Sequence, residues 1–343
     1  MSQLNSNLPF SKALEKKENI FSRLNNYLNE IEKYKTDFSE LIHSSLKIEK
    51  VKNNQIDNPN IIAIDSARGI QRYIIGNFYA FTSVAYKDNN YEDNISDFDI
   101  ISYVEEEVEF ADRILEGLSM GSEIIIATKK LKEGKYDFIF MDGSISTFII
   151  KINSAITATT NANGPLAQKM YKNYFRLIKD FIFLLNSKRV FFIPKASQKD
   201  DLKVNLLKCV KDNKMKEIIE KISDIKLTQL ILNPLEYIKI EDPKGHQYNL
   251  HNPFEKDINK FMKFEELKKQ LITLANEFKV YYFKGISNYS YRIESFSDIF
   301  PESIIAQNTF SKNFYLIQQA DRKAKDYVTV LLQESFPLEE QIR

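Results

Sequence analysis

The sequence has little cysteine, little glycine and no long apolar run. Cys209 is the single cysteine among 343 residues, so neither an intramolecular disulfide nor a cysteine-based zinc site can form. The longest apolar runs, such as FIFLL at 181–185, fall far short of the roughly 20 residues that a membrane span needs. The first twenty residues contain no apolar core typical of secretory signal peptides. We therefore expect a cytoplasmic protein without a membrane span.

Several common catalytic motifs are also missing from the sequence. It contains no P-loop for phosphate binding, no dinucleotide glycine fingerprint and no His-Glu-x-x-His zinc motif. We therefore expect that the chain does not hydrolyse ATP itself. The sequence also lacks the glycine-rich phosphate loops that a phosphotransferase of the sugar-kinase type would need. His246 and His251 flank a loop without acids at ligand spacing, so we expect no metal site there.

Charge is abundant but balanced, with 48 basic and 47 acidic residues and a formal net charge of +1. A polyanionic partner must therefore be met by a local basic patch, because the net charge is too small to attract it. Hydrophobic residues make up 43% of the chain, enough for a large core, and the length allows one large domain or two modest ones.

The N-terminal part is expected to be helical. Apolar residues in 11–50 alternate in steps of four and three, which indicates a heptad seam, and 52–60 is rich in turn-forming residues. This divides the chain into a helical segment with linker at 1–60 and a larger domain at 61–343. The helix either lies on its own domain or pairs with a second protomer or a partner protein. The seam consists of Ile20, Leu24, Tyr27, Ile31, Tyr34, Phe38 and Leu41.

The remaining chain alternates between strands and helices. Strands are predicted at 61–65, 72–87 (one long strand or a hairpin), 97–103, 137–141, 189–193, 228–240, 280–284 and 290–296. Helices are predicted at 102–118, 122–132, 165–186, 201–222, 262–278 and 313–333. Buried strands separated by helices imply parallel neighbours, and the early extended segments imply an antiparallel flank. The order predicts an α/β fold with an RNase H-like mixed sheet flanked by helices, and a doubly wound fold is the alternative.

Two of the buried strands end in an aspartate followed by a small polar segment. Asp65 ends IIAID and precedes Ser66, and Asp142 ends DFIFMD and precedes Gly143-Ser144. Strand ends of open α/β sheets are where ligands bind, and two half-buried acids side by side need a cation to stay charged. Oxygen-only ligands favour Mg²⁺ or Mn²⁺ over zinc. The alternative is that each aspartate only caps a turn or a helix.

A third acid and a basic region accompany the two aspartates. The segment 102–118 contains Glu105, Glu106, Glu107, Glu109 and Glu116, most of which must form a solvated face. Glu107 lies four residues before Ala111, near the apolar stripe, and could point at the sheet. Residues 143–199 contain nine basic residues and one acidic residue, a local charge of +8 that suits a phosphate backbone or, alternatively, an ordinary solvated surface. Within that region Lys195 follows the strand RVFFI almost directly, so it could meet a scissile phosphate.

Five segments, in this order, resemble the NurA family of DNA-end-processing nucleases over about residues 61–330. They are IIAIDSARG, MDGSIS, FFIPKASQ, YYFKGISNYSYRIESF and QQADRKAKDY. The resemblance implies an RNase H-like fold and Mn²⁺-dependent cleavage of single-stranded DNA with 5′→3′ digestion of DNA ends. It also implies a homodimer that works with a HerA-type hexameric ATPase, in DNA repair or antiviral defence.

Position by position, the resemblance implies Asp65, Glu107 and Asp142 as metal ligands, with Lys195 and Asp321 completing the catalytic set. Arg68, Lys195 and Arg292 are expected to contact DNA, and Glu294 completes the Arg-x-Glu strand. The sequence departs from the family pattern at two places. The spacing after Glu107 is long, so Glu106 or Glu109 could replace it, and the family tyrosine falls on Asn313, with Phe314 and Tyr315 shifted.

A non-catalytic DNA-binding or ATPase-adaptor subunit with the same fold is the alternative function. The loss of either strand-end aspartate would favour that alternative. Both are present, which favours the enzyme.

Overall fold

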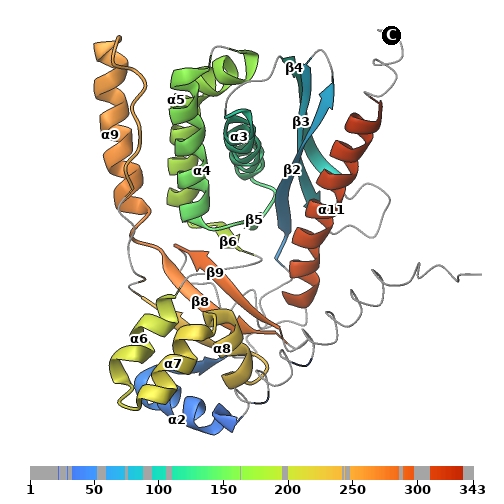
Figure 1. Ribbon diagram of the computed structural model, residues 1–343. Coiled ribbons are helices and arrows are strands. Elements are labelled where there is room, and N and C mark those ends of the chain that lie inside the picture. The colour runs from blue at the N-terminus through green and yellow to red at the C-terminus, as the bar shows by residue number, and fades with distance from the viewer. Residues whose placement is uncertain are drawn as a thin grey trace, which may run out of the picture.

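The computed structural model places helices on both faces of one long mixed sheet (Figure 1). It describes residues 33–51, 59–73, 76–87, 95–105, 110–162, 164–194, 200–241, 248–285, 289–296 and 310–334, together with 22, 29 and 243. The strands are β1 (Ile48–Lys50), β2 (Ile61–Tyr73), β3 (Gly76–Lys87), β4 (Ile95–Glu105), β5 (Phe138–Asp142), β6 (Val190–Ile193), β7 (Glu236–Ile240), β8 (Lys279–Lys284) and β9 (Ser290–Ser295). The helices are α2 (Lys35–Ser45), α3 (Ala111–Glu133), α4 (Ile145–Ala158), the 3₁₀ turn η1 (Thr159–Asn161), α5 (Pro165–Asn186), α6 (Asp201–Cys209), α7 (Asn213–Lys221), α8 (Asp224–Ile231), α9 (Ile258–Leu274) and α11 (Phe310–Glu334).

Within the described residues the sheet order is β1-β7-β8-β9-β6-β5-β2-β3-β4. Strands β2, β5 and β6 are parallel neighbours, whereas every other neighbouring pair is antiparallel. The meander β2-β3-β4, continued on the other side of β2 by β5 and β6, confirms the RNase H-like arrangement that the order of elements predicts. The segment 72–87, left open between one strand and a hairpin, contributes the second arm of the β2–β3 hairpin.

The two faces of the sheet carry separate cores. Helices α3, α4 and α5 cover one face, and their apolar side chains pack with alternate residues of the strands, such as Ile62 and Ile64 of β2. In the described part of the chain, α11 is the helix that covers the other face, toward which Ile61 and Ala63 of the same strand point (Figure 1). Successive side chains of a strand point to opposite faces, so position along β2 decides which core each residue joins. No helix among the described residues has the length and apolar character needed to cross a membrane.

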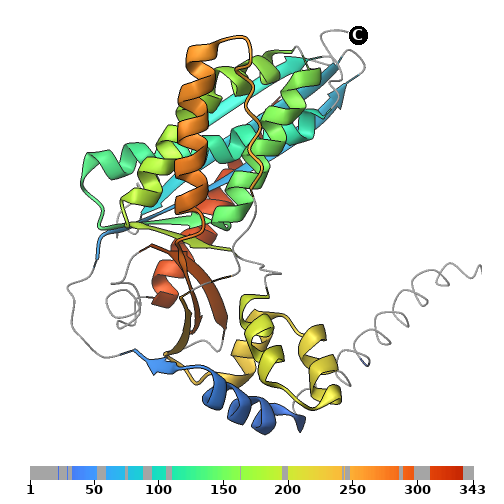
Figure 2. The same cartoon turned by 90° about the vertical axis from the view of Figure 1, so that its left-hand side faces the viewer.

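A small group of helices closes one end of the sheet. Helices α6, α7 and α8 lie together with α2 beside the outer strands β1, β7 and β8, below the main helical layer (Figures 1 and 2). Strand β9 joins this end to the rest of the sheet, because it pairs with β8 on one side and with β6 on the other. The outer strands β1, β7 and β8 are therefore continuous with the central strands through β9.

The N-terminal segment differs from the continuous helix expected over 11–50. In the part that the structure describes, α2 ends at Ser45 and Ile48–Lys50 form β1, which pairs with β7. The pairing is long-range, with Ile48 opposite Ile238, so it does not show in local periodicity. Of the heptad seam, Phe38 is fully buried in the main core and Tyr34 and Leu41 pack against it, whereas the seam residues before 33 lie outside the described residues.

The helices expected at 102–118 and 122–132 are instead one helix that starts later. Strand β4 continues to Glu105, because its pairing with β3 extends that far, and α3 then runs without a break from Ala111 to Glu133. Gly117 and Gly121 lie inside this helix rather than ending it. An added Cβ at Gly117 would lie only 2.2 Å from the Cβ of Ala155 in α4, so the glycine lets the two helices approach closely.

Gly117→Ala should therefore lower the free energy of unfolding. Overpacking of a tight contact costs about 1–3 kcal/mol, which outweighs the roughly 1 kcal/mol of helix propensity that alanine gains over glycine. Gly121→Ala is the matched control, because its new Cβ would meet only the flexible end of Leu177, at 2.8 Å. Urea unfolding should rank Gly117→Ala below Gly121→Ala. If Gly117→Ala proved as stable as the parent, α3 and α4 would not be in this close contact.

Two further segments correct the predicted elements. The strand expected over 228–240 begins only at Glu236, because Ser223 caps a helix, α8, by accepting a hydrogen bond from the backbone N–H of Lys226. The single helix expected over 201–222 is divided into α6 and α7, since Asp212 caps a new helix start by accepting from the backbone N–H of Met215. Side-chain capping of this kind stabilises a helix start that hydrophobic periodicity does not reveal.

Candidate active site

Asp65 and Asp142 lie side by side on neighbouring parallel strands. The β2–β5 register pairs Ile64 with Met141, so the two aspartates occupy the next position on each strand. Ala63 and Phe140, two residues earlier, both belong to the core under α11, and alternation therefore places both aspartates toward that face. Asp65 is 5% exposed and Asp142 is half-buried. Asp142 ends β5, but the expectation that Asp65 ends its strand is wrong, because β2 continues past it in its pairing with β3. The two carboxylates are thus brought together at the point where β5 ends beside β2.

The turn after Asp142 is built for a sharp change from strand to helix. Gly143 has a φ of 105°, a conformation that residues with a Cβ rarely adopt. Ser144 then caps α4, because its Oγ accepts a hydrogen bond of 3.0 Å from the backbone N–H of Thr147. The Asp-Gly-Ser sequence therefore places a carboxylate at the strand end, allows the turn and starts the helix.

A further acid, Glu123, lies behind the pair on the other face of the sheet. Glu123 belongs to α3, is 3% exposed and accepts a hydrogen bond from the hydroxyl of Ser66, which also receives one of 2.7 Å from Ser119. Glu123 is not among the site residues predicted from the sequence. The one indication of it in the sequence is that this glutamate directly precedes the apolar run IIIA at 124–127. Ser66, the residue that follows Asp65, is thus bound to a buried carboxylate.

The two paired aspartates fit a hard divalent cation. Mg²⁺ and similar ions are commonly held by one or two carboxylates, with water and substrate phosphates completing the shell. In the described part of the chain no three His, Cys, Asp or Glu side chains are grouped closely enough to hold a metal ion together. Two carboxylates beside the end of β5 are a donor set that leaves coordination positions for phosphate oxygens and water.

The family model for the NurA domain matches residues 59–325, more than half of the chain and both aspartate-bearing strands. The chain belongs to the NurA family. A comparison with curated protein sequences finds no match.

Solved structures of NurA proteins share the fold. The crystal structure of the NurA nuclease from Sulfolobus solfataricus aligns with a TM-score of 0.58 at 13% identity, covering 94% of this chain and 98% of that one. A crystal structure of NurA with manganese aligns with a TM-score of 0.54 at 13% identity, covering 93% and 97%. At such identities the likeness establishes the architecture over nearly the whole chain.

Two of the site residues expected from the NurA resemblance lie outside the described residues. Glu107 is one of them, as are its alternatives Glu106 and Glu109, while the backbone of Glu105 ends β4. Lys195 is the other. The strand before it, β6, pairs Ile193 with Asp142, so the chain enters the 195–199 segment from a point beside the aspartates.

Asp321 and Arg68 occupy different faces of the sheet. Asp321 lies on α11, half-buried, and accepts a hydrogen bond of 2.9 Å from Lys325 one turn later. Its neighbour Ala320 is buried in the core that covers the aspartate face. Arg68 points toward α3, where it pairs with Glu116 at 2.8 Å. Asp321 thus belongs to the helix over the aspartates, and Arg68 does not share their face.

Arg292, expected to contact DNA, is buried instead. Its side chain is 1% exposed and is held between the carboxylates of Asp201 and Glu294. Burial alone would lower the pKa of Arg292, but Glu294, then Tyr282 and Asp201, raise it above its ordinary value. The guanidinium therefore stays charged inside the protein, where it joins elements of the fold.

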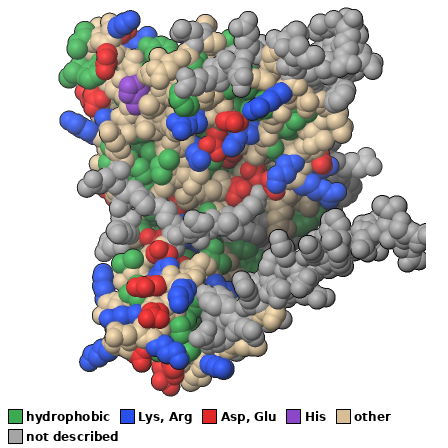
Figure 3. Space-filling view, viewed as in Figure 1, with side chains coloured by type: hydrophobic (Ala, Val, Ile, Leu, Met, Phe, Trp, Pro, Cys, Tyr) green, Lys and Arg blue, Asp and Glu red, His purple; other side chains and the backbone are tan. Residues whose placement is uncertain are grey.

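The basic residues of 143–199 are spread over several elements. Lys151 on α4 pairs with Glu116, Arg176 on α5 pairs with Asp180, and Arg189 donates to backbone carbonyls that precede β5, at the opposite strand end from Asp142. Figure 3 shows basic and acidic side chains mixed across the face it presents, without one basic patch. On that face the local charge of +8 in sequence therefore does not form one continuous basic track.

Proposed function

We propose that this chain is a divalent-metal-dependent nuclease that hydrolyses phosphodiester bonds in DNA. The observation that carries the proposal is the placement of Asp65 and Asp142 side by side on parallel strands β2 and β5, at the point where β5 ends. The family assignment supports it, and so does the fold shared with a solved NurA nuclease and with a NurA structure that contains manganese. We propose Mn²⁺ as the cofactor, with Mg²⁺ as a substitute.

The chemistry of the proposed reaction divides between the ion and the protein. A bound divalent cation supplies Lewis-acid polarisation of a phosphate oxygen and lowers the pKa of bound water. Asp65 and Asp142 would hold the ion with their carboxylate oxygens, and we propose that Glu107 would add a third carboxylate ligand. Lys195 neutralises charge on the phosphate, and Asp321 lies on the helix over this face as a further polar group.

Labelled DNA provides the direct test of this function. Single-stranded and duplex DNA should be incubated with the purified protein in Mn²⁺, in Mg²⁺ and in EDTA. We expect cleavage with Mn²⁺, weaker cleavage with Mg²⁺ and none with EDTA. DNA binding without cleavage in either metal would contradict the nuclease and favour a non-catalytic DNA-binding or ATPase-adaptor subunit.

We also propose finer properties that follow from the family. The chain acts as a single-strand endonuclease and a 5′→3′ exonuclease on DNA ends, in the cytoplasm, as a homodimer that works with a HerA-type hexameric ATPase. An external motor is consistent with the absence of any P-loop in this sequence. DNA labelled at the 5′ or the 3′ end, digested with and without such an ATPase, separates these properties from the basic nuclease activity.

Lys195→Ala should weaken both DNA binding and turnover. A lysine that contacts one phosphate releases about one counterion, so the slope of log K against log salt should flatten by roughly one unit. Lys135→Ala is the matched control, because Lys135 is exposed and precedes β5 at the opposite strand end from Asp142. Fluorescence anisotropy over a salt series measures the slope. An unchanged slope with unchanged turnover would show that Lys195 does not meet the DNA.

A further inference from the structure

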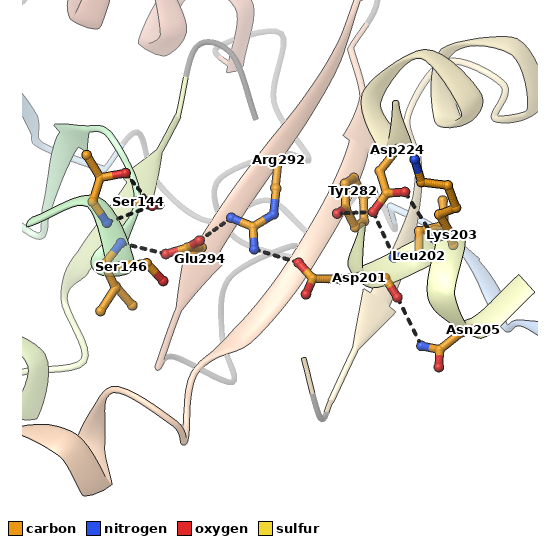
Figure 4. A network of polar contacts seen from close by, with 12 residues as sticks. Ser144, Ser146, Asp201, Leu202, Lys203, Asn205, Asp224, Tyr282, Arg292 and Glu294 are labelled. Carbon is orange, nitrogen blue, oxygen red and sulfur yellow. Dashed lines mark hydrogen bonds and ion pairs between the residues drawn. The ribbon is translucent and has the colours of Figure 1, made fainter. Parts of the chain in front are cut away.

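A buried chain of charges connects the group of helices α6–α8 to the start of α4. Arg292 donates to Asp201, the first residue of α6, at 2.7 Å, and its other terminal nitrogen donates to Glu294. The second oxygen of Glu294 accepts a hydrogen bond of 2.7 Å from the backbone N–H of Ile145. Figure 4 shows Arg292 between Asp201 and Glu294, with Glu294 directed toward the Ser144 end of the network.

All three charged side chains of this network lie inside the protein. Glu294, Arg292 and Asp201 are 0%, 1% and 7% exposed. Removing such charges from water costs several kcal/mol, and a buried ion pair is often replaceable by apolar residues without loss of stability. Stability is therefore a weak explanation for this arrangement. The hydrogen bond that Glu294 accepts from the backbone N–H of Ile145 points to a more specific role.

Ile145 is the first residue of α4 and lies three residues after Asp142. Its N–H is one of the backbone groups that a helix start leaves without an intrahelical acceptor, and a carboxylate there also interacts favourably with the helix dipole. Ser144 caps Thr147 in the same turn. The turn from Asp142 to Ile145 is thus fixed at its helix end by two acceptors, one of which comes from a distant strand.

The strand register places Glu294 in line with this turn. Glu294 pairs with Phe192 of β6, and Phe192 pairs with Met141, the residue before Asp142. On the far side, Asp201 is held in place because Asp224 accepts the backbone N–H groups of Leu202 and Lys203 at 2.8 and 3.0 Å. The network therefore runs from a capped helix start to the turn that carries Asp142.

We propose that Glu294, oriented by Arg292, is a positioning residue that holds the turn from Asp142 to Ile145, and with it the Asp142 carboxylate beside Asp65. The inference rests on the proposed metal-dependent nuclease for its functional consequence. Its structural part, that Glu294 restrains this turn, stands independently of any activity.

Hydrogen–deuterium exchange on the full-length protein without metal tests whether Glu294 restrains this turn. Glu294→Ala should accelerate exchange in a peptide covering 141–147 by about tenfold, since it removes the acceptor for Ile145. Glu294→Gln keeps the volume, but it replaces one of the two carboxylate oxygens, which face Arg292 and Ile145 separately, by an NH2 donor, so a smaller acceleration is expected. This second variant keeps the test decisive if the alanine variant does not fold.

Tyr282→Phe is the matched control for exchange. It removes a buried hydrogen bond of 2.7 Å to Asp224, near Arg292, without removing the acceptor of Ile145. We expect a reduced melting temperature with unchanged exchange at 141–147. Equal acceleration in Tyr282→Phe and Glu294→Gln would overturn the proposal, because it would show general loosening. Unchanged exchange in Glu294→Gln would also overturn it.

The functional consequence is measured by the Mn²⁺ concentration that gives half-maximal cleavage. Groups that orient metal ligands typically contribute about 10–100-fold in metal affinity or activity, so Glu294→Gln should raise this concentration about tenfold. DNA binding in EDTA should stay unchanged, and calorimetric titration with Mn²⁺ alone provides a readout apart from activity. A parent protein that cleaves no DNA contradicts the proposed function. A parent that cleaves, beside a Glu294→Gln variant with parental Mn²⁺ dependence, contradicts the positioning role.

Discussion

Asp65→Asn and Asp142→Asn, made separately, should each reduce Mn²⁺-dependent DNA cleavage by at least about a hundredfold. Asparagine keeps the size of the side chain and one oxygen but removes the negative charge that holds a divalent cation. Metal stabilisation of the transition state contributes several kcal/mol, and each 1.36 kcal/mol is a factor of about ten in rate. Rates measured under single-turnover conditions with labelled DNA give the comparison.

Asp137→Asn is the matched control for these two variants. Asp137 precedes β5 at its opposite end and accepts the backbone N–H of Asn60 at 2.8 Å, a bond that the oxygen of asparagine can replace. It should cleave at nearly the parental rate. All three variants should keep the parental circular dichroism spectrum, because neither Asp65 nor Asp142 fills an apolar core. Cleavage near the parental rate by either test variant would remove that residue from the metal site.

The strands that carry the site could be predicted because their apolar runs are local. The run VFFI fills β6, FIFM forms β5 up to Asp142, and IIAI forms the first part of β2, which continues beyond Asp65. An aspartate directly after two of these runs is visible without a structure. The long amphipathic helix at 165–186 has its start marked by Pro165. The features that place Asp65 and Asp142 together were thus present in the sequence as short-range patterns.

The features that could not be predicted depend on contacts between distant segments. The role of Gly117 inside α3 is understood only from the close approach of α4. The strand β1 depends on its pairing with β7, in which Glu49 lies opposite Tyr237, 188 residues away in the sequence. Arg292 in the strand SYRIES suggested a surface cation. Only the positions of Asp201 and Glu294 reveal that it is buried.

The heptad seam left two interpretations open, packing on its own domain or contact with a second protomer or a partner, and the structure divides the segment between them. Phe38 is 0% exposed in the main core, and α2 packs on α6 and α8. Glu49 in β1 accepts a hydrogen bond of 2.8 Å from the hydroxyl of Tyr237. Residues 33–51 are therefore part of the fold, and the contact role is proposed only for the seam residues before them.

Two truncations that begin at Lys33 and at Val51 should consequently behave differently. Loss of a buried phenylalanine alone costs about 3–5 kcal/mol, a large share of the stability of a typical domain, and the second truncation also removes β1 and exposes β7 as an edge strand. We expect the truncation at Val51 to lower the melting temperature strongly or to abolish folding. The truncation at Lys33 should keep the parental melting temperature and cleave short DNA.

The shorter truncation then tests the contact surface, because it removes Ile20, Leu24, Tyr27 and Ile31 while leaving the core intact. Tyrosine combines an apolar ring with a polar end, which suits a contact surface at least as well as a closed core. Sedimentation velocity and ATPase-stimulated degradation should both be measured on it. Loss of the dimer or of the stimulation, with short-substrate cleavage retained, is the expected result. Retention of both the dimer and the stimulation would place the contact elsewhere on the molecule. For the longer truncation, a parental melting temperature would contradict the packing of α2.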